Sequence, residues 1–293
     1  MISELVRSLS EQYKYKVEMH CHSNPASACG EFTPEEVVQM SAEHGYSGIV
    51  LTNHFMRACI RDGESDAEYV DRYLDDYYRA KREGERIGLE VILGLELRVR
   101  ANSNDYLVYG DISREDAIRM IGAADGTLEH FRELVPPSED KLLIQAHPCR
   151  HGCLRAEPDL LDGVEVLNLH PFQKGAISFA AKFAREVGGV ITSGSDFHHP
   201  GTAGMGGIYT AALPRSGAEL VEIQAQLRAR DGGVLADLSA PDGEVGGIGD
   251  HTVKAARGKI RRDAAHIALP DGEAGGQRVE RDIFLRQRAG TFP

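Results

Sequence analysis

Short apolar runs alternate with longer amphipathic segments over the first two thirds of the chain. Four runs are apolar at nearly every position, which is typical of strands buried on both faces; they span 48–52, 89–97, 142–146 and 164–168. Shorter runs predict three further strands, at 16–22, 106–109 and 190–192. The amphipathic segments predict helices over 1–15, 35–44, 66–87, 114–123, 127–134, 176–187 and 217–230.

The order of these elements predicts the fold class. Helix starts and stops are well marked, as in Thr33-Pro34-Glu35, which supplies an N-cap, a proline at the first helical position and an acid in the first turn. Strands that alternate with helices at this spacing indicate an α/β fold built of parallel β-α-β units. No glycine-rich dinucleotide fingerprint follows the first strand. We therefore expect a barrel rather than a Rossmann sheet.

Nearly every predicted strand ends in a side chain that can bind a metal. The residues at these ends are His22, His54, Glu96, His147 and Asp196. In a β/α-barrel the C-terminal ends of the strands form the active-site face. His20 precedes His22 by two positions, and residues two apart in a strand point to the same face. The pattern predicts a metal site of imidazoles and carboxylates at that face.

Composition restricts the classes of protein that remain. The 293 residues are 42% hydrophobic and 27% charged, which is typical of a soluble globular protein. No apolar run reaches the ~18 residues of a membrane span, and the N-terminus has no apolar signal-peptide core. Five irregularly spaced cysteines predict reduced thiols and a cytoplasmic location. A net charge of -12 argues against generic binding of duplex DNA.

The last part of the chain has a different character. From residue 231 onward it is rich in glycine, lacks alternation and has almost no aromatic residues. We therefore divide the chain into a barrel domain at 1–230 and a glycine-rich tail at 231–293 that we expect to be poorly ordered. The alternative is a divergent cap over the barrel.

Five short motifs, in this order, carry a resemblance to a known family. They are His20-Cys21-His22, Thr52-Asn53-His54, Glu96 within Gly94-Leu95-Glu96-Leu97, His147-Pro148, and Ser195-Asp196-Phe197-His198. Together they resemble the PHP (polymerase and histidinol phosphatase) superfamily of metal-dependent phosphoesterases. The resemblance implies a distorted (β/α)7 barrel with two to three divalent ions at the C-terminal strand ends. Zn, Mn or Fe would suit such mixed nitrogen and oxygen ligands.

The resemblance also implies how the ligands are shared. His20, His22, Glu96 and Asp196 would hold one ion, Glu96 would bridge to a second ion with His147, and a third ion would take His54 and His198. Glu96, Asp196 and His198 would be the catalytic residues. Metals lower the pKa of bound water to about 7 and clamp phosphoryl oxygens, so a metal-bound hydroxide would attack phosphorus.

Three departures from the family pattern are visible. The loop after the first motif offers Cys29 where the family often has His or Asp, so Cys29 is either a metal ligand or a buried structural cysteine. Asn53 replaces the usual Asp of the second motif, which should weaken the orientation of His54. A histidine normally found between Glu96 and His147 has no clear counterpart. The region holds Tyr106, Tyr109 and His130, and Asn168 or His170 could contribute instead.

Arginines near the proposed ligands suggest how a phosphate is held. Arg98 and Arg150 are the candidates for substrate binding, with Arg57 as a third, because a guanidinium pairs with phosphate oxygens in a fork. Glu18 lies two residues before His20 and is expected beside the ligands; the alternative is a plain surface carboxylate.

The function expected from these residues is hydrolysis of a phosphoester bond in a small phosphorylated substrate. One alternative is a phosphodiesterase or exonuclease that acts on the ends of short oligonucleotides. A second is a non-catalytic PHP-like binding module with incomplete metal sites, supported by Asn53 and the absent histidine. Hydrolysis of a C–N bond on a related barrel is a third, and the motif order fits it less well.

Overall fold

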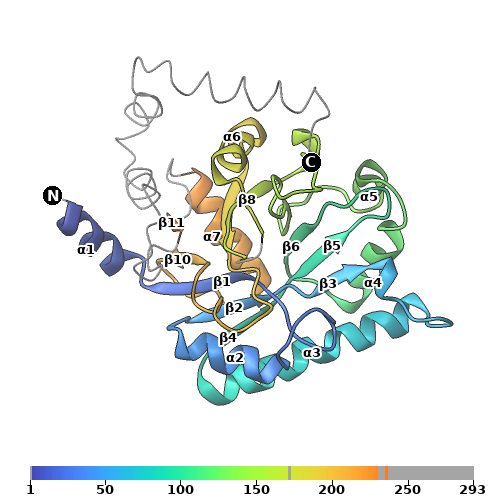
Figure 1. Ribbon diagram of the computed structural model, residues 1–293, viewed down its shortest axis with the longest axis horizontal. Coiled ribbons are helices and arrows are strands. Elements are labelled where there is room, and N and C mark those ends of the chain that lie inside the picture. The colour runs from blue at the N-terminus through green and yellow to red at the C-terminus, as the bar shows by residue number, and fades with distance from the viewer. Residues whose placement is uncertain (1, 171–172, 230–234, 237–293) are drawn as a thin grey trace, which may run out of the picture.

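Two sheets, each flanked by helices, form the body of the protein. The computed structural model describes residues 2–170, 173–229 and 235–236 (Figure 1). The first sheet has the order β11-β10-β1-β2-β4, with β1 at Tyr15–Cys21, β2 at Gly48–Leu51, β4 at Glu90–Leu93, β10 at Ile208–Thr210 and β11 at Leu235–Ala236. The second has the order β3-β5-β6-β7-β8-β9, at His54–Met56, Leu95–Arg98, Tyr106–Gly110, Lys141–Gln145, Gly163–Asn168 and Val190–Gly194. The architecture is mixed α/β.

The two sheets meet at two places: where β2 and β4 are followed by β3 and β5, and where the residues after β9 reach the end of β1. The predicted strand over 89–97 is divided at Gly94 into β4 and β5, and β2 and β3 are divided at 52–53. Backbone hydrogen bonds continue across these breaks, from Gly94 to Leu51 (3.0 Å) and from Glu96 to Asn53 (3.0 Å). On the other side, the residues after β9 pair with the end of β1, where the Asp196 amide donates to the His20 carbonyl at 2.9 Å.

Strand β6 corrects the expectation of an all-parallel arrangement. It runs antiparallel to both β5 and β7. The physical reason is the connection from β5, which spans only residues 99–105 and holds no helix. A parallel return needs a crossover of about a dozen residues or more, whereas a short connection is enough for an antiparallel pair. As a consequence, the start of β6 lies at the same edge as the C-terminal ends of its neighbours.

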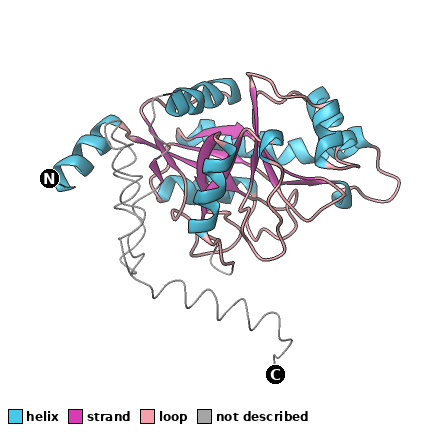
Figure 2. Ribbon diagram, turned by 90° about the horizontal axis from the view of Figure 1, so that it is seen from above, coloured by secondary structure: helices cyan, strands magenta, loops and turns pink. Residues whose placement is uncertain are grey.

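The predicted helices are confirmed, and their ends follow from local chemistry. Reciprocal side-chain and backbone hydrogen bonds cap α2, α3 and α4 through Thr33, Ser65 and Ser113. The helices are α1 (Ile2–Gln12), α2 (Pro34–Glu43), α3 (Asp66–Ile87), α4 (Arg114–Ala123), α5 (Leu128–Leu134), α6 (Ile177–Val187) and α7 (Gly217–Ala229). Helices lie outside the strands, and α1 extends from one side of the body (Figures 1 and 2).

The apolar faces of β3 and β5 pack into the largest core cluster. Phe55 and Leu97 are fully buried there together with Tyr69 and Tyr73 of α3. Since side chains alternate along a strand, the neighbours His54 and Glu96 point to the opposite face, toward the candidate site. Among the described residues, no helix combines the length and the apolar character that crossing a bilayer requires. The expected tail at 231–293 lies outside the described residues, apart from Leu235–Ala236.

Candidate metal centre

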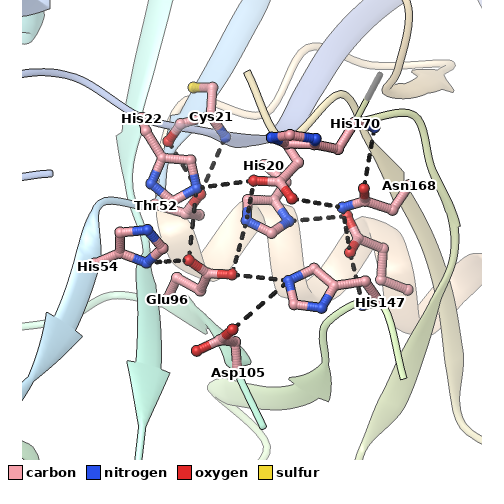
Figure 3. A network of polar contacts seen from close by, with 12 residues as sticks. His20, Cys21, His22, Thr52, His54, Glu96, Asp105, His147, Asn168 and His170 are labelled. Atoms are coloured by element: carbon pink, nitrogen blue, oxygen red, sulfur yellow. Dashed lines mark hydrogen bonds and ion pairs between the residues drawn. The ribbon is translucent and has the colours of Figure 1, made fainter. Parts of the chain in front are cut away.

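Seven of the residues predicted as metal ligands come together at the ends of the strands. His20 projects from β1, His22 follows the end of that strand, His54 projects from β3 and Glu96 from β5 (Figure 3). The others follow the ends of β7 and β9: they are His147, Asp196 and His198. Five of the seven, His20, His22, Glu96, His147 and Asp196, are no more than 2% exposed.

Glu96 lies at the middle of the cluster, between four imidazole rings. Its Oε1 is 3.1 Å from Nε2 of His20 and 3.1 Å from Nε2 of His147. Its Oε2 is 2.5 Å from Nδ1 of His54 and 3.5 Å from Nε2 of His22. A carboxylate placed in this way has one oxygen toward each side of the cluster, which is the arrangement that a bridging ligand requires.

Asp196 closes the cluster from the opposite side. Its Oδ1 is 3.2 Å from Nε2 of His22, 3.5 Å from Nε2 of His20 and 3.3 Å from Nδ1 of His198. Both Asp196 and His147 have positive φ angles, of 52° and 29°. Such backbone conformations are costly for residues other than glycine and tend to occur at functional sites. Here they accompany the turns that bring both side chains into the cluster.

The donor atoms fit divalent ions. They form overlapping groups of three whose ligand atoms lie within 4.8 Å of one another: His20–His22–Glu96, His20–His147–Asp196, Glu96–Asp105–His147 and His22–His54–His198. Several of these buried atoms have no hydrogen-bond partner of suitable geometry, namely Nε2 of His20 and His22, Nδ1 of His54 and Oε2 of Glu96. Buried polar atoms are normally paired, so a convergent set without hydrogen bonds is typical of a metal site.

The carboxylates and imidazoles of the cluster shift one another's pKa values. Burial alone would raise the pKa of Glu96, but the positive His54 and His20 hold it well below its usual value. Burial alone would lower the pKa of His20, but the charges of Glu165, Asp196 and Glu96 raise it well above its usual value. The imidazole of His20 therefore holds its proton tightly beside ionised carboxylates, and a divalent cation at the same place would compete with that proton.

Glu165 of β8 orients His20, and it was not among the residues predicted from the sequence. Its Oε1 is 3.0 Å from Nδ1 of His20, which leaves Nε2 of that ring to face the cluster. Its Oε2 accepts hydrogen bonds from the backbone of His147 and the side chain of Asn168, both at 3.0 Å. A carboxylate on the far nitrogen of a ligating imidazole fixes its tautomer and orientation. The available signal was a charged residue inside an otherwise apolar predicted strand.

Asp105 is the second residue near the centre that was not predicted. It lies between Glu96 and His147 in the chain, the region in which the family's additional histidine was expected. It precedes β6, and its Oδ2 lies 3.8 Å from Nε2 of His147. Arg98 holds it through a fork of two hydrogen bonds, from Nε to Oδ1 at 2.7 Å and from Nη2 to Oδ2 at 2.8 Å. Two nitrogens of Arg98, which was predicted to bind substrate, thus donate hydrogen bonds to Asp105.

The other residues considered for that position lie elsewhere or make different contacts. Tyr109 donates its hydroxyl to the Met19 carbonyl at 2.8 Å, and His130 is exposed beside Glu133 on α5. Tyr106 is buried in the core, where its hydroxyl accepts from Asn104 at 3.2 Å.

Asn168 and His170 adjoin the centre. The side chain of Asn168 donates to Glu165 at 3.0 Å and to Asp196 at 3.3 Å. The ring of His170 packs edge-on against that of His198, with centroids 5.5 Å apart.

The side chain of Asn53 contacts Ser23, and the expected weaker orientation of His54 stays a prediction. Oδ1 of Asn53 accepts from the Ser23 amide at 2.7 Å, and its Nδ2 donates to the Ser23 hydroxyl at 2.9 Å. The buried Asp76 of α3 accepts from the same hydroxyl at 3.0 Å and from the Ala26 amide at 2.9 Å. The amide of Asn53 therefore helps to fix the loop after β1.

Cys29 lies at the outer side of the centre. It is exposed, so the alternative of a buried structural cysteine is wrong. Burial of part of the side chain would raise the pKa of its thiol, but hydrogen bonds with His198 and His54 outweigh this and lower the pKa to about 6. A thiolate at this place could join the group formed by His54, His198 and His22.

Arg150 and Glu18 also have defined positions. Nη2 of Arg150 contacts Asp196 and donates to Oδ1 of Asn168 at 2.9 Å, so this guanidinium lies at the edge of the cluster. Glu18 is 2% exposed and accepts from the backbone amides of His20 (3.0 Å) and Ser195 (2.9 Å). The surface alternative for Glu18 is therefore wrong; its carboxylate fixes the backbone beneath two predicted ligands.

Comparison with known proteins tests the resemblance that the five sequence motifs carry. A family model described as the PHP domain matches residues 18–167, just over half of the chain. This chain belongs to the PHP domain family. The match includes the predicted ligands from His20 to His147 and ends before Asp196 and His198. No curated protein matches the chain.

Solved structures support the PHP fold. A two-domain protein from Bacteroides vulgatus, described as containing a predicted PHP-like metal-dependent phosphoesterase, is 17% identical with a TM-score of 0.50, over 76% of this chain. This chain spans 64% of the length of that protein. PsfC from Pseudomonas syringae is 15% identical with a TM-score of 0.52, over 71% of this chain and 87% of PsfC. At such identities the likeness extends to the fold alone.

Proposed function

We propose that this PHP-domain protein is a metal-dependent hydrolase of phosphoester bonds in small phosphorylated substrates. The observation that carries the proposal is the meeting of imidazole and carboxylate groups from five strand ends around Glu96, with buried donor atoms that no hydrogen bond satisfies. The fold relatives include a protein described as containing a predicted PHP-like metal-dependent phosphoesterase. Mixed nitrogen and oxygen donors suit Zn, Mn or Fe.

The strand arrangement supports a distorted (β/α)7 barrel as the scaffold. With β2 and β3 taken as one broken strand and β4 and β5 as another, each strand borders the next, from β1 round to β9. Hydrogen bonds between the ends of β1 and β9 connect the last strand to the first. The antiparallel β6 is the distortion. The ligands then share the C-terminal rim of the barrel, where enzymes of the β/α-barrel class have their active sites.

The distances support a sharing of ligands among two to three ions. His20, His22, Glu96 and Asp196 would hold one ion. Glu96 would bridge to a second ion, held also by His147 and by Asp105 in place of the absent histidine. His54 and His198, close to His22 and Cys29, would hold the third.

The residues around the ions have separate tasks. Bound divalent ions would supply a hydroxide at neutral pH and neutralise charge on the phosphoryl oxygens. Arg150, at the edge of the cluster, would pair with a phosphoryl oxygen through its guanidinium. Glu165 would keep His20 in one tautomer, and Arg98 would keep Asp105 in place.

Two observations favour catalysis over a binding module with incomplete metal sites. Asn53 makes a defined pair of hydrogen bonds with Ser23, and Asp105 supplies a carboxylate beside His147. Both observations count against an incomplete site. The formal net charge of -12 favours small substrates or short oligonucleotides over long duplexes, and a cytoplasmic location remains part of the proposal.

The test joins metal content to turnover. Purified protein, a His20→Ala/Asp196→Ala double variant and a His130→Ala control would be analysed for bound metal and assayed on a phosphomonoester and a phosphodiester. His130 is exposed on α5 and makes no contact with the cluster. Two or more ions and turnover in the wild type and the control, both lost in the double variant, support the proposal. Absence of bound metal and of turnover after Zn or Mn is added would contradict it.

A further inference from the structure

A cavity of about 590 Å³ lies at the ends of β3 and β5. Three arginines line it: Arg57, Arg98 and Arg100. The remaining lining residues are Met56, Ala58, Ile60, Val99, Asn102 and Asp125. This is the size of a pocket for a small-molecule group. Each of the three guanidinium groups is paired with an aspartate: Arg57 with Asp66, Arg98 with Asp105 and Arg100 with Asp125.

Strand register connects this cavity to the centre. His54 pairs with Glu96, and two residues further along the same strands Met56 pairs with Arg98. Residues two apart in a strand share a face, so Met56 and Arg98 continue the face that carries His54 and Glu96, about 7 Å further along. The neighbouring strands β3 and β5 are seen together in Figure 1. A substrate held at the metals can therefore extend along this face into the cavity.

Two of the arginines have donors left for a ligand. Arg57 uses Nη1 on Asp66 at 2.6 Å, and Arg100 uses Nη1 on Asp125 at 2.8 Å. Their other guanidinium N–H groups donate to no residue in the described part of the chain. Both side chains are accessible, at 33% exposed for Arg57 and 72% for Arg100. Arg98 differs, because its fork is engaged with Asp105 and it links the cavity to the centre.

We propose that this cavity is a second anion-binding subsite, in which Arg57 and Arg100 hold an anionic group of the substrate remote from the bond that is cleaved. The inference rests on the proposed function and narrows it. The substrate class is a phosphoester whose alcohol part carries another phosphate or a carboxylate. Arg57 and Arg100 follow Met56 and Arg98 in the chain, and these two lie about 7 Å along the strands from His54 and Glu96, so the second anion would lie beyond about 7 Å from the metal ligands. Guanidinium groups bind such anions in charge-assisted pairs.

The experiment measures binding separately from turnover. Alkane-α,ω-bisphosphonates of increasing length, which cannot be hydrolysed, would be compared by calorimetry with the matching monophosphonates and with ω-carboxyalkyl phosphonates, on the metal-loaded protein. The variants are Arg57→Gln, Arg100→Gln and the double variant. The control is Arg86→Gln, an exposed arginine paired with Glu83 on α3. The carboxylate series distinguishes a phosphate subsite from one that accepts either anion.

We expect a bisphosphonate of suitable length to bind at least about tenfold more tightly than its monophosphonate, and the double variant to remove this advantage while binding of the monophosphonate stays the same. A merely structural role of the arginines would weaken both ligands equally. Equal binding of the two ligands by the wild type, or an advantage that survives in the double variant, would overturn the subsite. Failure of the proposed function has a different signature: phosphonates bind, but the corresponding phosphoesters are not hydrolysed.

Discussion

The inner and outer sides of the metal centre are built differently. On the inner side, His20, His147 and Asp196 are almost completely buried, and Glu165 fixes His20 through Nδ1. On the outer side, the side chain of His54 is 20% exposed, and it faces the exposed Cys29. Oriented, buried ligands lose less freedom when they bind an ion. We therefore expect the inner ions to bind more tightly, and the substrate to approach from the outer side.

Glu96 belongs to both sides, so its replacement should have the largest effect. Glu96→Gln keeps the shape of the side chain but removes the charge between four imidazoles. We expect metal to be lost from both sides and kcat/KM to fall by at least about 10²–10³-fold, the range found when one charge-stabilising group is removed. Elemental analysis and steady-state kinetics would measure this. Retention of all ions with near-normal turnover would show that Glu96 is not the shared ligand.

Glu165 distinguishes the sides, because it touches only the inner one. Glu165→Gln leaves the contacts of His54 and His198 intact but weakens the orientation of His20. We expect the affinity for the inner ion to fall about 10–100-fold, as is usual for residues behind a ligating histidine. Competition with a metal-binding dye would give the affinity. Glu43→Gln, at an exposed position of α2, serves as a control that removes the same charge away from the centre, and an equal loss in both variants would contradict the assignment.

Cys29 tests the outer side alone. Cys29→Ser should weaken only the outermost ion, by about tenfold, since the thiolate is one donor beside three histidines. The inner ions should keep their affinity. Titration of the metal-free variant with Zn would measure the steps separately. If the first and tightest step changed instead, the division into a tight inner side and a weak outer side would be wrong.

The pH dependence of thiol alkylation gives the smallest but most specific effect. The pKa of Cys29 is lowered to about 6 in the absence of metal, whereas burial raises the pKa of Cys59. Because the thiolate is the reactive form, iodoacetamide should modify Cys29 before Cys59 at pH 7, with a rate that falls as the pH drops through about 6. Peptide mass spectrometry would follow both sites. Equal rates at pH 7, or no slowing by added Zn, would contradict the contact with His54 and His198.

Most of the centre could be predicted because it obeys a simple geometric rule. Parallel strands bring their C-terminal ends to one edge, so the residues at the ends of predicted strands, such as His54, Glu96 and His147, had to lie near one another. The same reasoning predicted helix boundaries well where caps were explicit, as for α3 at Asp66–Ile87.

The residues that were missed break that rule. Asp105 comes before its strand, and only the antiparallel direction of β6 places it at the site. A short connection of seven residues was the signal for that reversal. Glu165 lies within β8, and the face on which its side chain lies depends on how the strand is packed. Periodicity does not predict that face, because the run is almost wholly apolar. Both residues orient or add to ligands, and such contacts follow from tertiary packing.

The central claim is that the cluster around Glu96 holds divalent ions, and anomalous diffraction from crystals grown with Mn or Zn tests it most directly. The account predicts peaks about 2.0–2.3 Å from Nε2 of His20 and His22 and from oxygens of Glu96 and Asp196, with higher occupancy on the inner side than beside Cys29. No peak within the cluster, with metal bound only at surface histidines such as His130, would contradict it.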